Sequence, residues 1–169
     1  MTTKRPTVVF VGPPAAGKSR IARRVAASLD EPYLDTDTAV VSLHGPISTI
    51  FSTQGESFFR DAERAAVKKA LATNGVVALG GGAVIDPGTR AELSEHRVAH
   101  ITISAEAVEP RLNPEKRPLL KDLASWVALA EARRAWYEEV ATKTFDASHR
   151  KIEDLANEVV QWLREETTR

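Results

Sequence analysis

The segment from Gly12 to Ser19 has the residue types and spacing that most directly suggest chemistry. It reads Gly-Pro-Pro-Ala-Ala-Gly-Lys-Ser and matches the phosphate-binding pattern G-x-x-x-x-G-K-[ST]. In this pattern, backbone N–H groups and a helix N-terminus face the anionic phosphates of a nucleotide. Lys18 is expected to reach the β- and γ-phosphates, and the Ser19 hydroxyl to coordinate Mg²⁺. A tight turn with an exposed lysine is the weaker interpretation, because the motif follows an expected strand and opens an expected helix.

Two carboxylates follow the next expected strand, in the sequence Asp35-Thr36-Asp37. Side chains at i and i+2 of an extended segment point the same way, so both carboxylates would face a ligand. One would support Mg²⁺ through water, and the other would hold an attacking hydroxyl and take its proton. A strand-end turn or a helix N-cap explains the same residues equally well.

Several arginines are placed where an anionic substrate could be held. Arg60 and Glu63 are three residues apart on an expected helix, so they share a face. A guanidinium steadied by a carboxylate suits bidentate binding of a substrate carboxylate, although an exposed ion pair is the simpler interpretation. Arg133 and Arg134 are adjacent on a helix and therefore about 100° apart, so only one of them is expected to face a cleft.

Two loop segments complete the candidate site. Gly80-Gly81-Gly82 follows an expected strand. Three glycines pack nothing and cost backbone entropy, so close approach of the backbone to a ligand explains them better than a flexible turn does. Arg117 lies in the proline-containing stretch 113–120, where it would close over the γ-phosphate as part of a lid.

The elements that position these residues alternate along the chain. Strands are expected at 7–11, 33–35, 76–79, 98–103 and 144–145, and helices at 17–29, 46–53, 56–73, 89–95, 123–140 and 152–163. Such alternation predicts an α/β fold with a parallel sheet covered on both faces. Ligands bind beyond the carboxyl ends of such strands, which is where the candidate residues converge.

Composition restricts the class of protein. The 169 residues suit one domain, and 23 basic residues balance 23 acidic residues, which argues against a nucleic-acid partner. No apolar run approaches the roughly 20 residues that cross a bilayer, so no membrane partner is expected. The first residues do not resemble a signal peptide, and the chain has no cysteine, so a cytoplasmic protein without disulfides or thiolate metal sites is expected.

Taken together and in order, these segments resemble the shikimate kinase family from Val8 to about Leu163. The resemblance rests on the following segments: Gly12 to Ser19, Asp35-Thr36-Asp37, Phe59-Arg60 with Glu63, Gly80-Gly81-Gly82 followed by Ala83-Val84, Arg117-Pro118-Leu119-Leu120, and Arg133 four residues before Tyr137. The phosphate-binding segment alone is shared by many nucleotide-binding proteins, whereas the combination is specific to this family.

The resemblance implies a fold and an activity. The fold would be a three-layer α/β/α domain with a five-stranded parallel sheet, as in nucleoside monophosphate kinases. This single domain, residues 1–169, would contain an acceptor-binding subdomain at about 35–63 and a lid at about 113–121. The protein would be a monomer that uses ATP and Mg²⁺ to phosphorylate the 3-hydroxyl of shikimate, in chorismate and aromatic amino acid biosynthesis.

The resemblance also implies residue roles. Asp37 would hold the 3-hydroxyl and act as the base, and Arg60 and Arg133 would clamp the carboxylate. Ser19 would bind Mg²⁺ with Asp35 in the outer shell, while Lys18 and Arg117 would stabilise the transferring phosphoryl group. The ATP site would comprise Gly12, Ala15, Ala16, Gly17, Lys18, Ser19, Arg20 and Arg117. The acceptor pocket would further include Phe51, Phe59, Glu63, Gly80, Gly81 and Gly82.

The sequence departs from the family pattern at three places. Ala15 replaces the usual glycine and is followed by Ala16, so a positive φ there would strain the backbone. Pro110, with Arg111 beside it, stands where the family often has an arginine that stacks on adenine. The stretch from Arg133 to Tyr137 lacks the proline of the family's R-x-P-L-Y.

Two other functions remain open from the sequence. One is a kinase for a different small hydroxylated acid, such as gluconate, and the other is a non-catalytic nucleotide-binding regulator. Retention of Lys18, Asp37 and Arg117 argues against the regulator. We expect the histidines to be surface or loop residues and the tryptophans to be packing residues, namely His44, His96, His100 and His149, and Trp126, Trp136 and Trp162.

Overall fold

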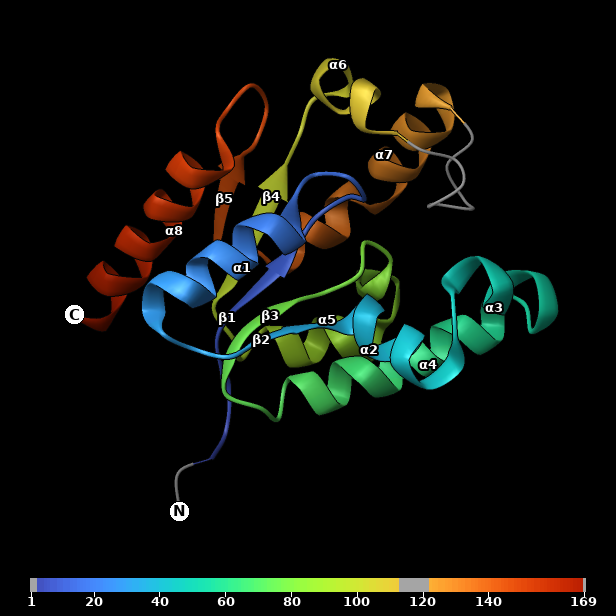
Figure 1. Ribbon diagram of the computed structural model, residues 1–169, viewed down its shortest axis with the longest axis horizontal. Coiled ribbons are helices and arrows are strands. Elements are labelled where there is room, and N and C mark those ends of the chain that lie inside the picture. Colours follow the sequence, from blue (N-terminus) through green and yellow to red (C-terminus); the bar gives the residue numbers. More distant parts are fainter. Residues whose placement is uncertain (1–2, 113–121, 169) are drawn as a thin grey trace.

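A five-stranded parallel sheet forms the centre of the protein, as expected from the alternating pattern (Figure 1). The computed structural model describes residues 3–112 and 122–168. The strand order is β2-β3-β1-β4-β5. The strands are β1 (Pro6–Val11), β2 (Tyr33–Asp35), β3 (Gly75–Ala78), β4 (Val98–Thr102) and β5 (Lys143–Asp146).

Helices cover both faces of the sheet and give the expected three layers (Figure 1). In the described residues they are α1 (Lys18–Leu29), α2 (Thr36–His44), α3 (Ile47–Thr53), α4 (Glu56–Ala70), α5 (Pro87–Leu93), α6 (Ala105–Val108), α7 (Leu123–Val140) and α8 (Ile152–Thr167), with the 3₁₀ turns η1 (Ala83–Ile85) and η2 (Glu109–Arg111). No helix in this part of the chain is long and apolar enough to cross a membrane.

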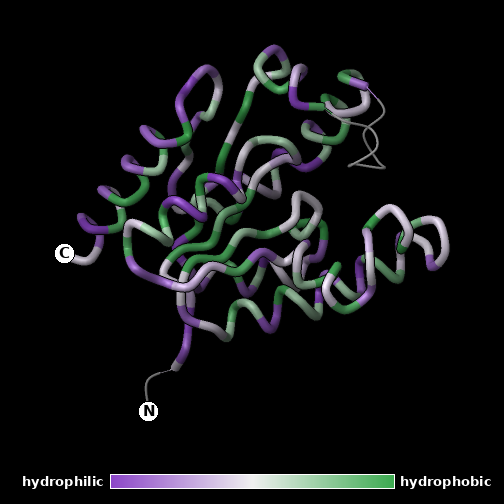
Figure 2. The backbone as a smooth tube through the Cα atoms, in the orientation of Figure 1, coloured by the Kyte–Doolittle hydropathy of each residue, from purple (hydrophilic) through white to green (hydrophobic). Residues whose placement is uncertain are grey.

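The two faces of the sheet carry separate apolar clusters. Along β1, Val8 and Phe10 pack with α1 and α8, whereas Val9 and Val11 pack with α4, α5 and α7. Successive strand residues point to opposite faces, and both faces are buried, so the strand is apolar throughout. Figure 2 shows this as green strands inside a shell of helices whose outer sides are purple.

A third apolar cluster lies away from the sheet. Val40 of α2, Ile50 of α3 and Phe59 of α4 are buried against one another. Figure 1 shows these three helices together at one end of the molecule. They hold the segment that contains Asp37, Phe51, Phe59 and Arg60 as a packed unit.

The expected extended geometry of Asp35-Thr36-Asp37 is wrong. Only Asp35 ends β2, and α2 begins at Thr36, so Asp37 lies in the first turn of a helix that the periodicity did not reveal. The alternative interpretation, an N-cap, is correct for Asp35, whose Oδ1 accepts the Thr38 N–H at 3.1 Å. The N-cap satisfies one of the N–H groups that a helix leaves unpaired in its first turn.

Two further features differ from expectation. The short helix α6 was missed, because four residues are too few to show a helical period. His100 is not a surface or loop residue but a buried residue of β4, where side chains alternate between two covered faces. The other element ends differ from expectation by small shifts, as is usual at helix and strand termini.

Candidate active site

The phosphate-binding segment forms a tight loop between β1 and α1. The Lys18 side chain is folded into this loop, with 8% of the residue exposed, and Nζ donates to the carbonyl oxygens of Gly12 and Pro13, each at 2.8 Å. Gly12 has a φ of +150°, and a Cβ there would collide with the carbonyl oxygen of Ile101 on β4. The loop geometry therefore requires glycine at this position.

Ala15 has a left-handed backbone conformation within this loop. Its φ is +65°, one of three positive values at non-glycine residues in the described chain. An L-residue with a Cβ is destabilised in this region by roughly 1–2 kcal/mol, because Cβ approaches the following carbonyl oxygen. The departure from glycine noted in the sequence thus places strain at the phosphate loop.

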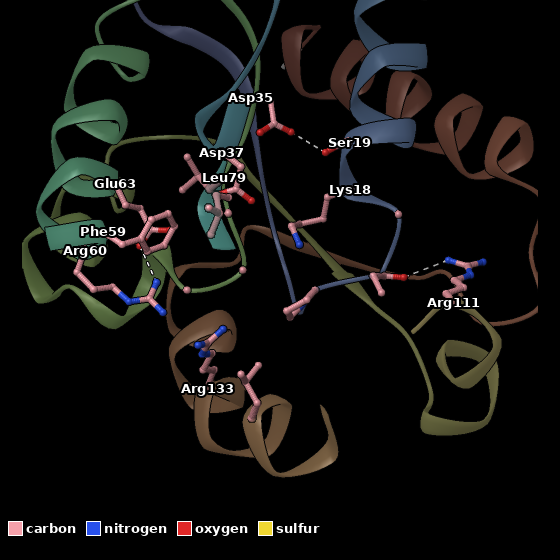
Figure 3. A pocket seen from close by; sticks show the side chains of 18 of the residues that line it. Lys18, Ser19, Asp35, Asp37, Phe59, Arg60, Glu63, Leu79, Arg111 and Arg133 are labelled. Carbon is pink, nitrogen blue, oxygen red and sulfur yellow. Dashed lines mark hydrogen bonds and ion pairs between the residues drawn. The ribbon is translucent and has the colours of Figure 1, made fainter. Parts of the chain in front are cut away.

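Ser19 and Asp35 form the oxygen-rich side of the site. Ser19 Oγ donates to Asp35 Oδ2 at 2.6 Å, and the Tyr33 hydroxyl donates to the same oxygen at 3.1 Å (Figure 3). Burial raises the pKa of Tyr33 to about 12, so the phenol stays protonated and remains a donor. A hydroxyl and a carboxylate are the hard oxygen ligands that Mg²⁺ prefers.

The donor set fits Mg²⁺ bound together with a nucleotide rather than in an all-protein cage. Among the residues that the structure describes, no group of three or more His, Cys, Asp or Glu side chains is arranged to hold a metal ion. Protein-bound Mg²⁺ commonly uses one or two side chains and takes its other ligands from substrate phosphates and water. Ser19 and Asp35 match that pattern.

Arg60 and Glu63 form a largely buried pair, not an exposed one. Arg60 Nη1 donates to Glu63 Oε1 at 2.9 Å, and Glu63 is only 4% exposed. Burial raises the pKa of Glu63, although the Arg60 charge opposes the shift. Arg60 Nε is buried without a hydrogen-bond partner among the described residues. The guanidinium is therefore held on one edge and retains a donor for another group.

The three-glycine loop runs close to the site side chains. A Cβ on Gly80 would collide with the Asp37 carboxylate, and one on Gly82 with the Arg60 guanidinium. None of Gly80, Gly81 and Gly82 has a positive φ, so space rather than backbone conformation demands glycine here. Approach of this backbone to a ligand remains a prediction.

Two buried hydroxyls hold the glycine loop in place. The Gly80 N–H donates to Thr36 Oγ1 at 3.0 Å, and Tyr137 Oη donates to the Gly81 carbonyl oxygen at 2.5 Å. Burial raises the pKa of Tyr137 to about 12, so it stays a donor. We assigned no role to either residue from the sequence. Their only signals were positional: Thr36 lies between the two aspartates, and Tyr137 lies four residues after Arg133.

The phosphate loop has a similar anchor on α7. Trp126 Nε1–H donates to the Pro14 carbonyl oxygen at 2.9 Å, and the indole is buried. Trp126 was expected to be a packing residue, and it packs in the core while also fixing the loop. Arg111 Nη1 lies 3.4 Å from the Ala15 carbonyl oxygen on the other side of the loop.

Only one of the adjacent arginines on α7 faces the cleft, as expected. Arg133 is 7% exposed and lines the pocket. Arg134 points to the surface, where its Nε lies 3.1 Å from Glu138 Oε1. In Figure 3, Arg133 and Arg60 lie on the same side of the pocket, away from Ser19 and Asp35, with Lys18 between.

One pocket of about 480 Å³ brings most of the candidate residues together. Those that line it are Ala15, Gly17, Lys18, Ser19, Arg20, Asp35, Asp37, Phe51, Phe59, Arg60, Glu63, Gly80, Gly81, Gly82 and Arg133. Gly12 and Ala16 are buried and do not line it. Residues that line it but were not predicted are Pro14, Ile47, Leu79 and Leu129, and also Arg111, which we had noted only at a departure from the family pattern. Arg117 and the expected lid at 113–121 lie outside the described residues.

Comparisons with known proteins agree with this arrangement. The family model "Shikimate kinase" matches residues 14–164. The shikimate kinase of Mycobacterium tuberculosis is 44% identical over 165 residues, covering 94% of each chain. The structure of the shikimate kinase from Acinetobacter baumannii in complex with shikimate superposes with a TM-score of 0.89 at 28% identity, covering 99% of this chain and 97% of that one.

A more distant structure shares only the fold. The gluconokinase from Sinorhizobium meliloti superposes with a TM-score of 0.64 at 17% identity, covering 97% of this chain and 94% of that one. The family match and the close relatives cover nearly the whole chain, so this protein belongs to the shikimate kinase family.

Proposed function

We propose that this protein transfers the γ-phosphoryl group of ATP to the 3-hydroxyl of shikimate, giving shikimate 3-phosphate and ADP, in chorismate and aromatic amino acid biosynthesis. The supporting observation is that one pocket is lined both by Lys18 and Ser19 of the phosphate loop and by Asp37, Arg60 and Arg133. A nucleotide and a small acid placed there would meet. Family membership favours shikimate over gluconate, since the gluconokinase likeness extends only to the fold.

At the acceptor end, Arg60 and Arg133 would bind the shikimate carboxylate. Arg60 is already oriented by Glu63 at 2.9 Å, which reduces the entropy lost when its guanidinium grips a carboxylate. Asp37 would accept the proton of the attacking hydroxyl. Its carboxylate lies beside Gly80, whose lack of a Cβ leaves room for it, and this supports the role of a positioned general base.

At the phosphate end, backbone N–H groups of the loop and the N-terminus of α1 would hold the phosphates. Lys18 would stabilise charge on the transferring group, as would Arg117 in the lid expected at 113–121. Ser19 and Asp35 would hold Mg²⁺, which neutralises phosphate charge when bound. Arg20, Gly17 and Ala15 border the same space.

We further propose that residues 1–169 act as one domain, with the acceptor-binding part near 35–63, and that the protein is a cytoplasmic monomer. The small cluster of Val40, Ile50 and Phe59 supports a separately packed acceptor-binding part. A pocket lined by residues of a single chain supports a monomeric enzyme. Size-exclusion chromatography with light scattering would test the oligomeric state.

The test of this function is ADP release from ATP and Mg²⁺ with and without shikimate. We expect strong release that depends on shikimate, is absent with gluconate, and is lost in Lys18→Ala. Lys69→Ala removes an exposed lysine on α4 and serves as the matched control. Absence of stimulation by shikimate, in folded protein shown to bind ATP, would overturn the proposal and return attention to another acceptor or to a regulatory role.

A further inference from the structure

A second hollow adjoins the candidate active site. Its volume is about 340 Å³, at the lower end of the range of small-molecule sites, and it shares no lining residue with the first pocket. The two spaces divide neighbouring residues of the same segments between them. Pro13 and Arg134 line the hollow, whereas Pro14 and Arg133 line the active site. One wall, made of the phosphate loop and α7, therefore separates them.

A buried histidine with an unsatisfied nitrogen lies in this hollow. His100 on β4 is 4% exposed, and its Nδ1 has no hydrogen-bond partner among the described residues. Burial lowers the pKa of His100 to about 4, so the ring is neutral at neutral pH and one nitrogen is an acceptor. Buried polar atoms are nearly always paired, so this one indicates a missing partner.

The walls of the hollow offer aromatic surface. Trp126 and Tyr137 both line it. Their polar atoms are already engaged with the carbonyl oxygens of Pro14 and Gly81. They therefore present rings to the hollow rather than donors, which suits a planar apolar body.

The rim of the hollow disfavours anions. The Arg134 guanidinium lies between Glu131 and Glu138, at 3.5 Å and 3.1 Å. These two carboxylates and one guanidinium are the charged groups that line the hollow, so they leave one net negative charge. The phosphates of ATP and the carboxylate of an acceptor acid would be repelled.

We propose that this hollow binds a small planar aromatic molecule that carries an N–H donor and no negative charge, with the donor directed to His100 and the ring between Trp126 and Tyr137. Its occupant acts on both loops of the active site, because Trp126 holds Pro14 and Tyr137 holds Gly81. This coupling to catalysis rests on the proposed function, whereas binding itself does not.

The test uses benzimidazole as the probe and benzoate as its anionic counterpart. Binding is followed by the ¹⁵N resonances of the His100 side chain in the full chain. We expect benzimidazole to shift these resonances with or without saturating ATP and shikimate, and benzoate to leave them unchanged. His100→Leu removes the acceptor, Ala130→Phe fills the hollow from α7, and Ala135→Phe makes the same change at an exposed position of that helix. Binding in Ala130→Phe and His100→Leu, followed by other signals of the chain, should be lost and in Ala135→Phe retained.

Each other outcome overturns the proposal. No shift up to about 1 mM probe would show that the hollow holds water only. Equal binding of benzoate would contradict the charge argument, and displacement by ATP or shikimate would place the probe in the active site. For the coupling, we expect bound benzimidazole to raise the KM for ATP and shikimate by roughly 5-fold or more. Unchanged KM values with the probe bound would refute the coupling.

Discussion

Removing one buried hydroxyl, in Tyr137→Phe, tests whether α7 positions the glycine loop. Tyr137 is 2% exposed, and its Oη donates to the Gly81 carbonyl oxygen at 2.5 Å. Phenylalanine keeps the ring beside His100, whose centroid lies 5.4 Å away, and removes only the donor. The carbonyl would then be buried without a partner, because water has little access to the site.

The expected loss in unfolding free energy is about 1–3 kcal/mol, the usual consequence of leaving a buried acceptor unsatisfied. For a chain of this length, that corresponds to a melting temperature lower by about 2–12 °C. The loop that carries Gly81 and Gly82 borders the acceptor end of the pocket. We therefore expect the KM for shikimate to rise by roughly tenfold, equivalent to about 1.4 kcal/mol, while the KM for ATP changes little.

The assay combines thermal unfolding with steady-state kinetics in both substrates. Tyr33→Phe is the matched control, because it removes the same atom from a hydroxyl 3.1 Å from Asp35 Oδ2. We expect that variant to alter the Mg²⁺ dependence and to leave the KM for shikimate unchanged. If Tyr137→Phe melts at the wild-type temperature with an unchanged shikimate KM, the positioning argument is refuted.

Three further predictions concern the loop, the base and the buried histidine. Ala15→Gly should increase the unfolding free energy by up to about 1 kcal/mol in urea denaturation, because relief of the +65° φ exceeds the added freedom of the unfolded chain, and a decrease would contradict the strain. Asp37→Asn should lower kcat by ~10²–10⁴-fold with ATP binding retained, and a near-normal rate would remove its role as base. Since the pKa of His100 falls from 6.5 to about 4 on burial, the folded protein binds fewer protons than the unfolded chain between these values. Stability should therefore decrease as the pH falls through that window, and His100→Leu should lose this part of the slope, whereas parallel stability curves would refute it.

The sequence by itself predicted most of the fold, because the relevant signals are local. Apolar runs followed by glycine marked the strands, and four-residue periodicity marked α1 and α8. The alternation of strands and helices then implied a parallel sheet, and the sheet order confirms it. Local signals were insufficient at residues 36–44, where a helix with little amphipathic pattern follows its N-cap directly.

The sequence also supplied the chemical identities in the site. The spacing of Gly12, Lys18 and Ser19 indicated phosphate binding, because that spacing reflects a local backbone geometry. The types of Asp37, Arg60 and Arg133 indicated an acidic acceptor, and they line one pocket with the phosphate loop. Their catalytic roles remain predictions for the experiments above.

Only the tertiary structure decided how these groups are held. The anchors of the glycine loop join residues 44 and 56 positions apart, Thr36 to Gly80 and Tyr137 to Gly81, and no local pattern encodes such pairs. The same holds for the burial of His100, because the contacts around that ring come from segments distant in sequence. Residue types and short spacings specify what chemistry is available, whereas long-range packing determines which side chains are buried, paired and aimed at the site.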